Sequence, residues 1–256
     1  MLFRSHAVVD APSFRYRPED RLPRGSMLYR PAGSRAAQHV EEFLLREGVA
    51  SFYPDLDAMF FSCGAPRRQM ERAGINVPRA VPVATSDGEL LADVVERLGG
   101  FPVVVKVGGE GGVGVMCADS MPVLRALLDH LCRSTVPELS AFVPDAMHHR
   151  VIVVGDRAVA TYKNPIAEDD FRSAPSDERA DYSADVPPEL ARLALAAARA
   201  IRVELAGVDI LSHASGRLYV LEANFPCFFA QATIGGGLDV AGPMVDWLLR
   251  KAQAPA

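Results

Sequence analysis

Three oxygen-bearing side chains near the C-terminal end could hold one divalent cation. Asp209 lies in a strand-like run at 207–211, and Glu222 and Asn224 lie in a second run at 218–224. An antiparallel hairpin would bring Asp209 across from the other two, which strand alternation puts on one face. Carboxylates among Val, Ile and Leu are costly to desolvate unless something neutralises them, and a magnesium ion that also holds nucleotide phosphates does so. The alternatives are a solvated hairpin edge or an acid paired with one of the many arginines.

A lysine in the first half, followed by a glycine-rich segment, could bind phosphate groups. Only three of the 27 basic residues are lysines, and one of them, Lys106, lies inside the apolar run 101–107. The lysine ammonium is a compact point charge, unlike the planar guanidinium of arginine, so a lysine at this position of an arginine-rich chain indicates a specific role. Chance, or a strand end that reaches solvent, would also explain its presence.

The glycine-rich segment contains the pattern G-x-G-x-x-G at Gly109, Gly111 and Gly114. A dinucleotide-binding fold would require a helix directly afterwards, whereas 113–117 is strand-like. The segment is therefore interpreted as a hairpin tip whose backbone amides close over phosphates, with a plain flexible hairpin as the alternative.

Composition limits the classes of protein that this chain can represent. The 256 residues are 49% hydrophobic and 23% charged, which is typical of a soluble globular protein with a sizeable core. The net charge of −5 gives no general attraction to nucleic acid or to an anionic membrane. The four cysteines are widely separated, and no apolar run resembles a signal peptide or spans a bilayer. We therefore expect a cytoplasmic protein with reduced thiols and with neither nucleic acid nor membrane as a partner.

Helix and strand signals alternate along most of the chain. Apolar periodicity, caps and prolines predict helices at 34–46, 66–72, 87–98, 121–132, 188–203 and from 239 onward. Short β-rich runs predict strands at 77–83, 103–107, 113–117, 139–143, 150–154 and 158–162, before the acidic hairpin. The polar stretch 164–185 is expected to be a mobile loop. The expected fold class is α/β (α+β).

Several short segments, in this order, resemble the ATP-grasp superfamily and, within it, the RimK-like carboxylate–amine ligases. They are 73–79, 101–106, 149–156, 170–173, 206–211 and 238–245, and the resemblance covers about 65–252. It implies two α/β lobes that grip a nucleotide, after a shortened N-terminal lobe. The implied domains are 1–62 for the reduced N-terminal lobe, 63–138 for the small lobe with the glycine-rich loop, and 139–256 for the large lobe with the magnesium site.

The same resemblance implies a role for each candidate residue. Lys106 would contact the nucleotide phosphates, beneath a cover formed by Gly109, Gly111, Gly112 and Gly114. Backbone groups around Phe142 and Val143 would hold the adenine. The transferred phosphoryl group or the substrate carboxylate would be faced by Arg150 and Arg172, with added charge from Lys163. Magnesium would be held by Asp209, Glu222 and Asn224. The alternatives are surface salt bridges for the two arginines and an exposed strand end for Lys163.

The implied activity is an ATP- and Mg²⁺-dependent ligation. ATP would phosphorylate a carboxylate, and an amine would attack the acyl phosphate to give an amide, with small molecules or peptides as substrates. A non-catalytic or regulatory ATP-binding protein is the first alternative, and a nicotinamide-dependent oxidoreductase, based on the glycine pattern alone, is the second. The short N-terminal lobe also raises the hypothesis of a homo-oligomer or a partner chain that completes it.

The sequence also departs from the pattern of that family. Ser62-Cys63 replaces the usual Asp-Lys, so an expected nucleotide-contacting lysine is absent, and Ser140-Ala141 replaces Gln-Glu at the hinge. His148 stands where aspartate is common, Ala174 stands where asparagine is usual, and Phe225-Pro226-Cys227 replaces a longer turn. These changes keep the non-catalytic alternative open, and the sequence does not indicate which acid and amine are joined.

Overall fold

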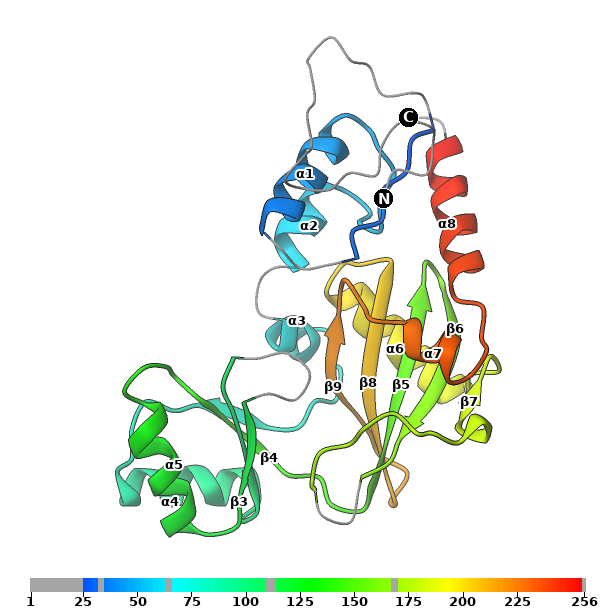
Figure 1. The fold of residues 1–256 in the computed structure, drawn as a ribbon. Helices are drawn as coiled ribbons and strands as arrows, with labels where there is room; N and C mark the ends of the chain where they lie inside the picture. The colour runs from blue at the N-terminus through cyan, green and yellow to red at the C-terminus, as the bar shows by residue number, and fades with distance from the viewer. Residues whose placement is uncertain (1–24, 32–34, 63–65, 109–113, 167–169, 255–256) are drawn as a thin grey trace.

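The protein is built on two antiparallel sheets. The computed structural model describes residues 25–31, 35–62, 66–108, 114–166 and 170–254. Within them the strand orders are β1-β4-β2-β3 in a small sheet and β7-β6-β5-β8-β9 in a large one. Figure 1 shows the two sheets in separate lobes that lie side by side. The mixed helix-and-sheet fold expected from the sequence is confirmed.

The small lobe covers its sheet with two helices. Its elements are β1 (Ala80–Pro82), α4 (Gly88–Leu98), β2 (Val103–Lys106), β3 (Val115–Ala118), α5 (Met121–Leu131) and β4 (Glu138–Ala141). Helix α4 begins where Asp87 accepts hydrogen bonds from the amides of Glu89 and Leu90, and it ends at Gly99 with φ 103°. Apolar side chains of both helices, including Leu91 and Leu124, pack on the buried face of β2.

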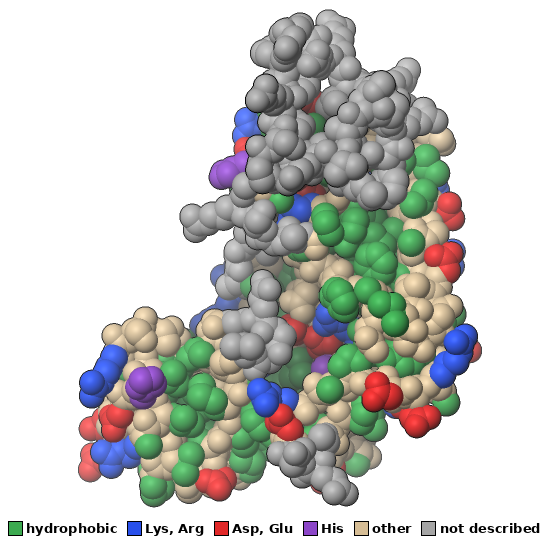
Figure 2. All heavy atoms as spheres, in the orientation of Figure 1, with side chains coloured by type: hydrophobic (Ala, Val, Ile, Leu, Met, Phe, Trp, Pro, Cys, Tyr) green, Lys and Arg blue, Asp and Glu red, His purple; other side chains and the backbone are tan. Residues whose placement is uncertain are grey.

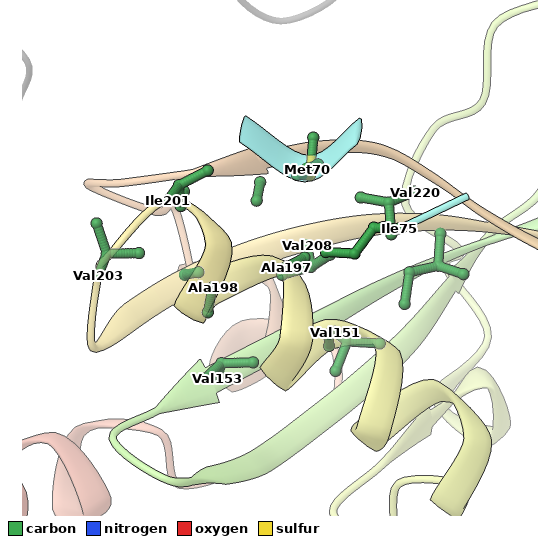
Figure 3. Packing of buried hydrophobic residues seen from close by; sticks show 14 of the residues in the cluster. Met70, Ile75, Val151, Val153, Ala197, Ala198, Ile201, Val203, Val208 and Val220 are labelled. Carbon is green, nitrogen blue, oxygen red and sulfur yellow. The ribbon is translucent and has the colours of Figure 1, made fainter. Parts of the chain in front are cut away.

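The large lobe holds its sheet between helices on both faces. Its elements are β5 (Ala146–Val154), β6 (Arg157–Asn164), a 3-10 turn (Arg179–Asp181), β7 (Tyr182–Ser183), α6 (Pro188–Ala200), β8 (Leu205–His213), β9 (Leu218–Asn224), α7 (Ala230–Ile234) and α8 (Ala241–Gln253). Helix α6 covers one face, where Ala197 and Ala198 lie against Val151, Val153 and Val208 (Figure 3). Side chains of α8 and of the segment around α7 pack against the other face.

The N-terminal segment contributes to the large lobe rather than forming a core of comparable size. It contains α1 (Arg35–Arg46) and α2 (Leu56–Ser62). Phe52 is buried in the cluster on the α8 face, and Tyr53 and Met59 are buried in the cluster on the α6 face. Arg30 pairs with Glu41 at 2.5 Å, and its guanidinium lies 5.4 Å from the ring centre of Phe225, just beyond β9. The N-terminal segment is therefore anchored next to the end of the acidic hairpin.

The boundaries between the lobes differ slightly from those expected. Helix α3 (Pro66–Arg72) precedes the small sheet, but its Met70 is buried in the large lobe's α6-side cluster. Strand β4 belongs to the small sheet, which extends to Ala141 instead of ending at residue 138. The two crossings between the lobes lie together, because the amide of Ala141 donates to the carbonyl of Arg79 at 2.8 Å. Within the described residues, no helix combines the length and apolar character needed to cross a bilayer.

Candidate active site

The acidic hairpin brings the three predicted oxygen-bearing side chains together. Asp209 on β8 and Glu222 on β9 are directly opposed in the antiparallel register, next to a bulge between Asp209 and Ile210. Opposed residues of an antiparallel pair share one face of the sheet. Asn224 lies two residues further along the same strand, and its side-chain amide is 2.7 Å from Glu222 Oε1. The sequence prediction that these groups converge is therefore consistent with the register.

Asp209 is engaged by two protein donors from the neighbouring strand β5. Arg150, its partner in the register, donates from Nη1 to Oδ2 at 2.5 Å, and His148 Nε2 lies 3.0 Å from Oδ1. The side chains of Arg150 and Asp209 are only 14% and 8% exposed. Burial alone would raise the pKa of Asp209, but the hydrogen bond from His148 and the charge of Arg150 outweigh it and lower that pKa. Asp209 is thus paired with an arginine, as one of the alternatives expected.

Arg150 occupies a space that only glycine leaves open. A Cβ at residue 207 would lie 2.7 Å from Arg150 Nε, so Gly207 lets the guanidinium lie across β8. Arg150 Nε is buried and has no hydrogen-bond partner within the described residues. Buried donors are nearly always satisfied, and an exception calls for an acceptor such as a ligand or water. Arg150 therefore has one buried donor, Nε, that no group of the described residues satisfies.

Lys106 approaches the acidic pair from the small lobe. It ends β2, and its register partner on β4 is Glu138. Burial and the nearby charge of Arg67 lower the pKa of Lys106, while the carboxylates of Glu138, Glu222 and Asp209 act in the opposite direction. Figure 2 shows acidic and basic side chains gathered in the hollow between the lobes. The ammonium and the two hairpin carboxylates thus influence one another across that hollow.

Glu222 differs from Asp209 in its electrostatic state. Solvent reaches its side chain, yet burial by the surrounding protein and the charge of Asp209 both raise its pKa. Both observations fit a carboxylate on the floor of an open hollow, where water enters but much of the hydration shell is lost. Asn224 donates to Glu222, and the carboxyl of Asp209 is also within hydrogen-bonding reach of it, which raises the pKa of Glu222 further. Glu222 is therefore the carboxylate of the pair whose ionised form its surroundings disfavour.

The glycine-rich segment lies in the sequence between strands β2 and β3. Strands β2 and β3 are antiparallel, and the amide of Val107 donates to the carbonyl of Gly114 at 2.9 Å. Gly114 has φ 80°, and a Cβ there would meet Val107 Cγ2 at 2.7 Å, so a side chain at this position is disfavoured. The strand–helix context of a dinucleotide fingerprint is absent at this hairpin. The other predicted residues of the segment, Gly109, Gly111 and Gly112, lie outside the described residues.

Arg172 and Lys163 lie apart from the acidic pair. Arg172 is 49% exposed, and its Nη2 is 2.6 Å from Oδ2 of Asp170. Lys163 is 45% exposed and donates to Asp181 at 2.7 Å. Neither cation contacts Asp209 or Glu222 within the described residues; Arg172 matches the surface salt-bridge alternative, and Lys163 matches the exposed strand end. Their predicted catalytic roles stay predictions that require these side chains to be redirected.

The predicted adenine site and the missed residues lie near the crossings between the lobes. Phe142 and Val143 directly follow β4 and are half-buried, so their backbone role stays a prediction. Arg67 on α3 donates to the carbonyl of Pro78, and its Nε lies 3.5 Å from Glu138 Oε1. Arg67 carries no local sequence signal, because its partners come from separate elements. His148 could have been inferred, since strand alternation places it on the same face as Arg150.

The oxygen-bearing groups of the hairpin suit magnesium. Within the described residues, no cluster of three or more His, Cys, Asp or Glu side chains forms an all-protein metal centre. Asp209, Glu222 and Asn224 offer two carboxylates and an amide oxygen, the hard ligands that Mg²⁺ accepts. Because Mg²⁺ usually takes one or two carboxylates and completes its shell with phosphates and water, this set fits a nucleotide-bound ion.

Comparisons with known proteins agree with this geometry. The RimK-like ATP-grasp domain matches residues 67–248. Ribosomal protein bS6–L-glutamate ligases from Shigella boydii and Escherichia coli are 32% identical over 187 residues, which cover 72% of this chain. The chain spans 61% of the length of these curated relatives.

Solved structures share the fold at low sequence identity. The ATP-grasp ligase PsnB, in complex with a minimal precursor, Mg and ADP, has a TM-score of 0.65 and 20% identity, covering 86% of this chain and 69% of PsnB. The D-alanine–D-alanine ligase from Coxiella burnetii has a TM-score of 0.61 and 13% identity, covering 86% and 65%. The sequence match and the shared fold together identify this chain as a member of the RimK-like ATP-grasp family.

Proposed function

We propose that the protein is an ATP- and Mg²⁺-dependent ligase that joins a carboxylate to an amine. The observation that carries the proposal is that Asp209 and Glu222 lie opposite each other on the hairpin with Asn224 beside Glu222, while Lys106 at the end of β2 is near enough for its charge and theirs to act on one another. An ammonium opposite a carboxylate pair is an arrangement that can hold a metal–polyphosphate between the lobes. The family and the names of its curated relatives support ligation as the reaction.

In this proposal the cleft residues bind and orient the reacting groups. Lys106 and the hairpin after β2 hold the phosphates of ATP, while Glu222 and Asn224, together with Asp209, hold the magnesium ion. When bound, Mg²⁺ neutralises negative charge on the phosphoryl group that is transferred. Arg150 offers its unpaired Nε to an anion next to Asp209, either the transferred phosphoryl group or the substrate carboxylate.

The proposed reaction needs no nucleophile from the protein. A carboxylate oxygen attacks the γ-phosphorus of ATP, the bond to the bridging oxygen breaks, and ADP leaves. The amine then attacks the carbonyl carbon of the acyl phosphate, loses a proton and releases phosphate. Catalysis comes mainly from positioning and from charge stabilisation in the hollow.

We propose that one of the two molecules joined is an amino acid, and that the other is an amino acid or the terminus of a peptide or protein. The names of the curated relatives include L-glutamate and a ribosomal protein, and PsnB was solved with a precursor. This chain spans 61% of the length of the bS6 ligases, so the relatives' substrates are not carried over to it.

Phosphate release tests the proposal directly. The protein is incubated with ATP, Mg²⁺ and pairs of amino acids or short peptides, and phosphate and amide products are measured. Hydroxylamine, which converts acyl phosphates to hydroxamates, reports the intermediate when the acid is present but the amine is missing. ATP-dependent amide formation with one pair supports the proposal. The absence of phosphate release and hydroxamate with every pair, in protein that binds Mg·ATP, contradicts it.

An ATP-binding protein without turnover is the second candidate. The engagement of both oxygens of Asp209 by Arg150 and His148 favours it, because a carboxylate held in this way has fewer lone pairs for a metal ion. The replacement of the expected lysine by Cys63, outside the described residues, is a second reason. Tight Mg·ATP binding without hydroxamate formation would distinguish this candidate.

A further inference from the structure

His148 links the acidic pair to the segment 170–176. Its Nε2 lies 3.0 Å from Oδ1 of Asp209, and its Nδ1 makes a short contact with the hydroxyl of Ser173. Because an ionised carboxylate only accepts hydrogen bonds, Nε2 carries the proton toward Asp209. In the neutral ring, Nδ1 then accepts from the Ser173 hydroxyl. A continuous chain of hydrogen bonds thus runs from the segment to the carboxylate.

The segment 170–176 folds back along the end of β6. The amide of Ala174 donates to the carbonyl of Pro165 at 3.1 Å, and the amide of Ser176 donates to the carbonyl of Lys163 at 3.2 Å. Ser173 lies at an isolated bridge with Ile166 and directly follows Arg172. Through its contact with His148, the side chain of Ser173 therefore connects the segment that carries Arg172 to the face of the sheet that bears Asp209.

We propose that His148 is a positioning residue that couples cation binding at Asp209 and Glu222 to the placement of segment 170–176. The proposal rests on the function proposed above, because it needs a nucleotide-bound cation at the acidic pair. Groups that hydrogen-bond a metal-ligating carboxylate fix its orientation, and their loss typically lowers metal affinity by about 10- to 100-fold. A ring that touches both Asp209 and Ser173 would transmit a change in the carboxylate to Arg172.

Two substitutions at residue 148 separate the two contacts. The side-chain amide of Asn reaches about as far as Nδ1 of His, so His148→Asn retains a partner for Ser173 and loses the contact to Asp209. The amide of Gln reaches about as far as Nε2, so His148→Gln retains the contact to Asp209 and loses Ser173. Ser173→Ala removes the segment's half of the link from the other side. His149→Asn is the matched control, because strand alternation points that side chain to the opposite face of β5.

Calorimetry and hydrogen exchange on the full chain measure the two halves of the link. Magnesium is titrated into protein with saturating ADP, which binds without turnover, and exchange is followed by mass spectrometry for peptides that cover 170–176. In the wild type we expect Mg·ADP to slow exchange of the Arg172, Ala174 and Ser176 amides severalfold. His148→Asn should weaken magnesium binding about tenfold or more.

The remaining variants decide whether coupling exists. We expect His148→Gln and Ser173→Ala to bind magnesium with a Kd within about threefold of the wild-type value. In both variants, Mg·ADP should cause no change in hydrogen exchange at 170–176. The control His149→Asn should behave as the wild type in both measurements. Wild-type protein that binds Mg·ADP with unchanged exchange in this segment, or variants that retain the full change, would overturn the coupling and leave the ligase proposal standing. Protein that binds no Mg·ADP at all would overturn both.

Discussion

The pairing of Arg150 with Asp209 predicts a large loss of stability when the arginine alone is removed. In Arg150→Met the carboxylate of Asp209 stays buried and loses its one guanidinium partner, while the contact from His148 is retained. Removing one partner of a buried pair typically costs about 3–5 kcal/mol, because the remaining charge is uncompensated. Since His148 still donates to Asp209, we expect a loss near the lower end, about 3 kcal/mol. For a chain of this size that corresponds to a fall in Tm of roughly 6–12 °C.

Urea unfolding followed by circular dichroism measures this loss, with Asp209→Asn and the double variant completing a thermodynamic cycle. The double variant should lose about 2 kcal/mol less than the sum of the single losses, because the two groups are in direct contact. Arg46→Met is the surface control, since its i,i+4 pair with Glu42 is worth about 0.3–0.5 kcal/mol. Additivity within about 0.5 kcal/mol would refute the idea that the pair acts as a unit.

The pH dependence of the same experiment has a defined sign. The pKa of Asp209 is lowered in the folded protein, so its ionisation contributes stability above the unfolded pKa of about 3.9, and this contribution is lost as the pH falls through the folded pKa. The difference between the wild type and Arg150→Met should therefore be constant near neutrality and shrink below about pH 4. A difference that grows on acidification would contradict this assignment.

Further predictions test the individual site residues. Lys106→Ala and Glu222→Gln should each abolish amide formation in the product assay and leave the far-ultraviolet spectrum unchanged. Glu222→Gln should also raise the Tm of the ligand-free protein at neutral pH, because burial and Asp209 disfavour its ionised form; an unchanged or lower Tm would argue against that repulsion. Arg172→Lys should fail to form amide if the guanidinium binds an anion through two nitrogens, and unchanged kinetics would leave Arg172 as a surface charge. Arg67→Met should weaken Mg·ADP binding about tenfold in calorimetry, because it removes the positive charge near Lys106. Arg68→Met is the control and should leave binding unchanged. Equal losses in both variants would show that the effect comes from disturbing helix α3 in general.

Sequence reasoning predicted the elements that carry strong local signals. Helix α4 follows from its Asp87 cap, its apolar period and Gly99, and the acidic hairpin follows from alternation on both sides of a turn. Helices α2 and α7 were missed, because each is a single short stretch held by tertiary packing rather than by its own periodicity. The segment 164–185 was expected to be a loop, yet it contains β7, whose Tyr182 stacks on Tyr162 at 5.1 Å. That pairing depends on partners far away in the sequence.

The candidate site was predictable in its residue types but not in its pairings. The convergence of Asp209, Glu222 and Asn224 could be predicted from the hairpin and from the alternation of side chains along its strands. To predict that Arg150 pairs with Asp209, one needs the register between β5 and β8. No local pattern specifies that register, because the two strands are far apart in the chain. Arg67 was missed for the same reason, since its neighbours lie on β4 and at the crossing near Pro78.

The charges around the hollow explain why a nucleotide and its cation would be expected to enter together. Three carboxylates and three cationic groups act on one another there: Asp209, Glu222, Glu138, Lys106, Arg150 and Arg67. These charges cancel in sum, so the hollow by itself has little excess attraction for either a bare polyphosphate or a free metal ion. A polyphosphate alone would add negative charge beside Glu222, whose pKa is already raised, and a cation alone would compete with Arg150 for Asp209. In the proposed site a metal–nucleotide complex would avoid both costs, because its phosphates would meet Lys106 and Arg150 while its cation would meet Glu222.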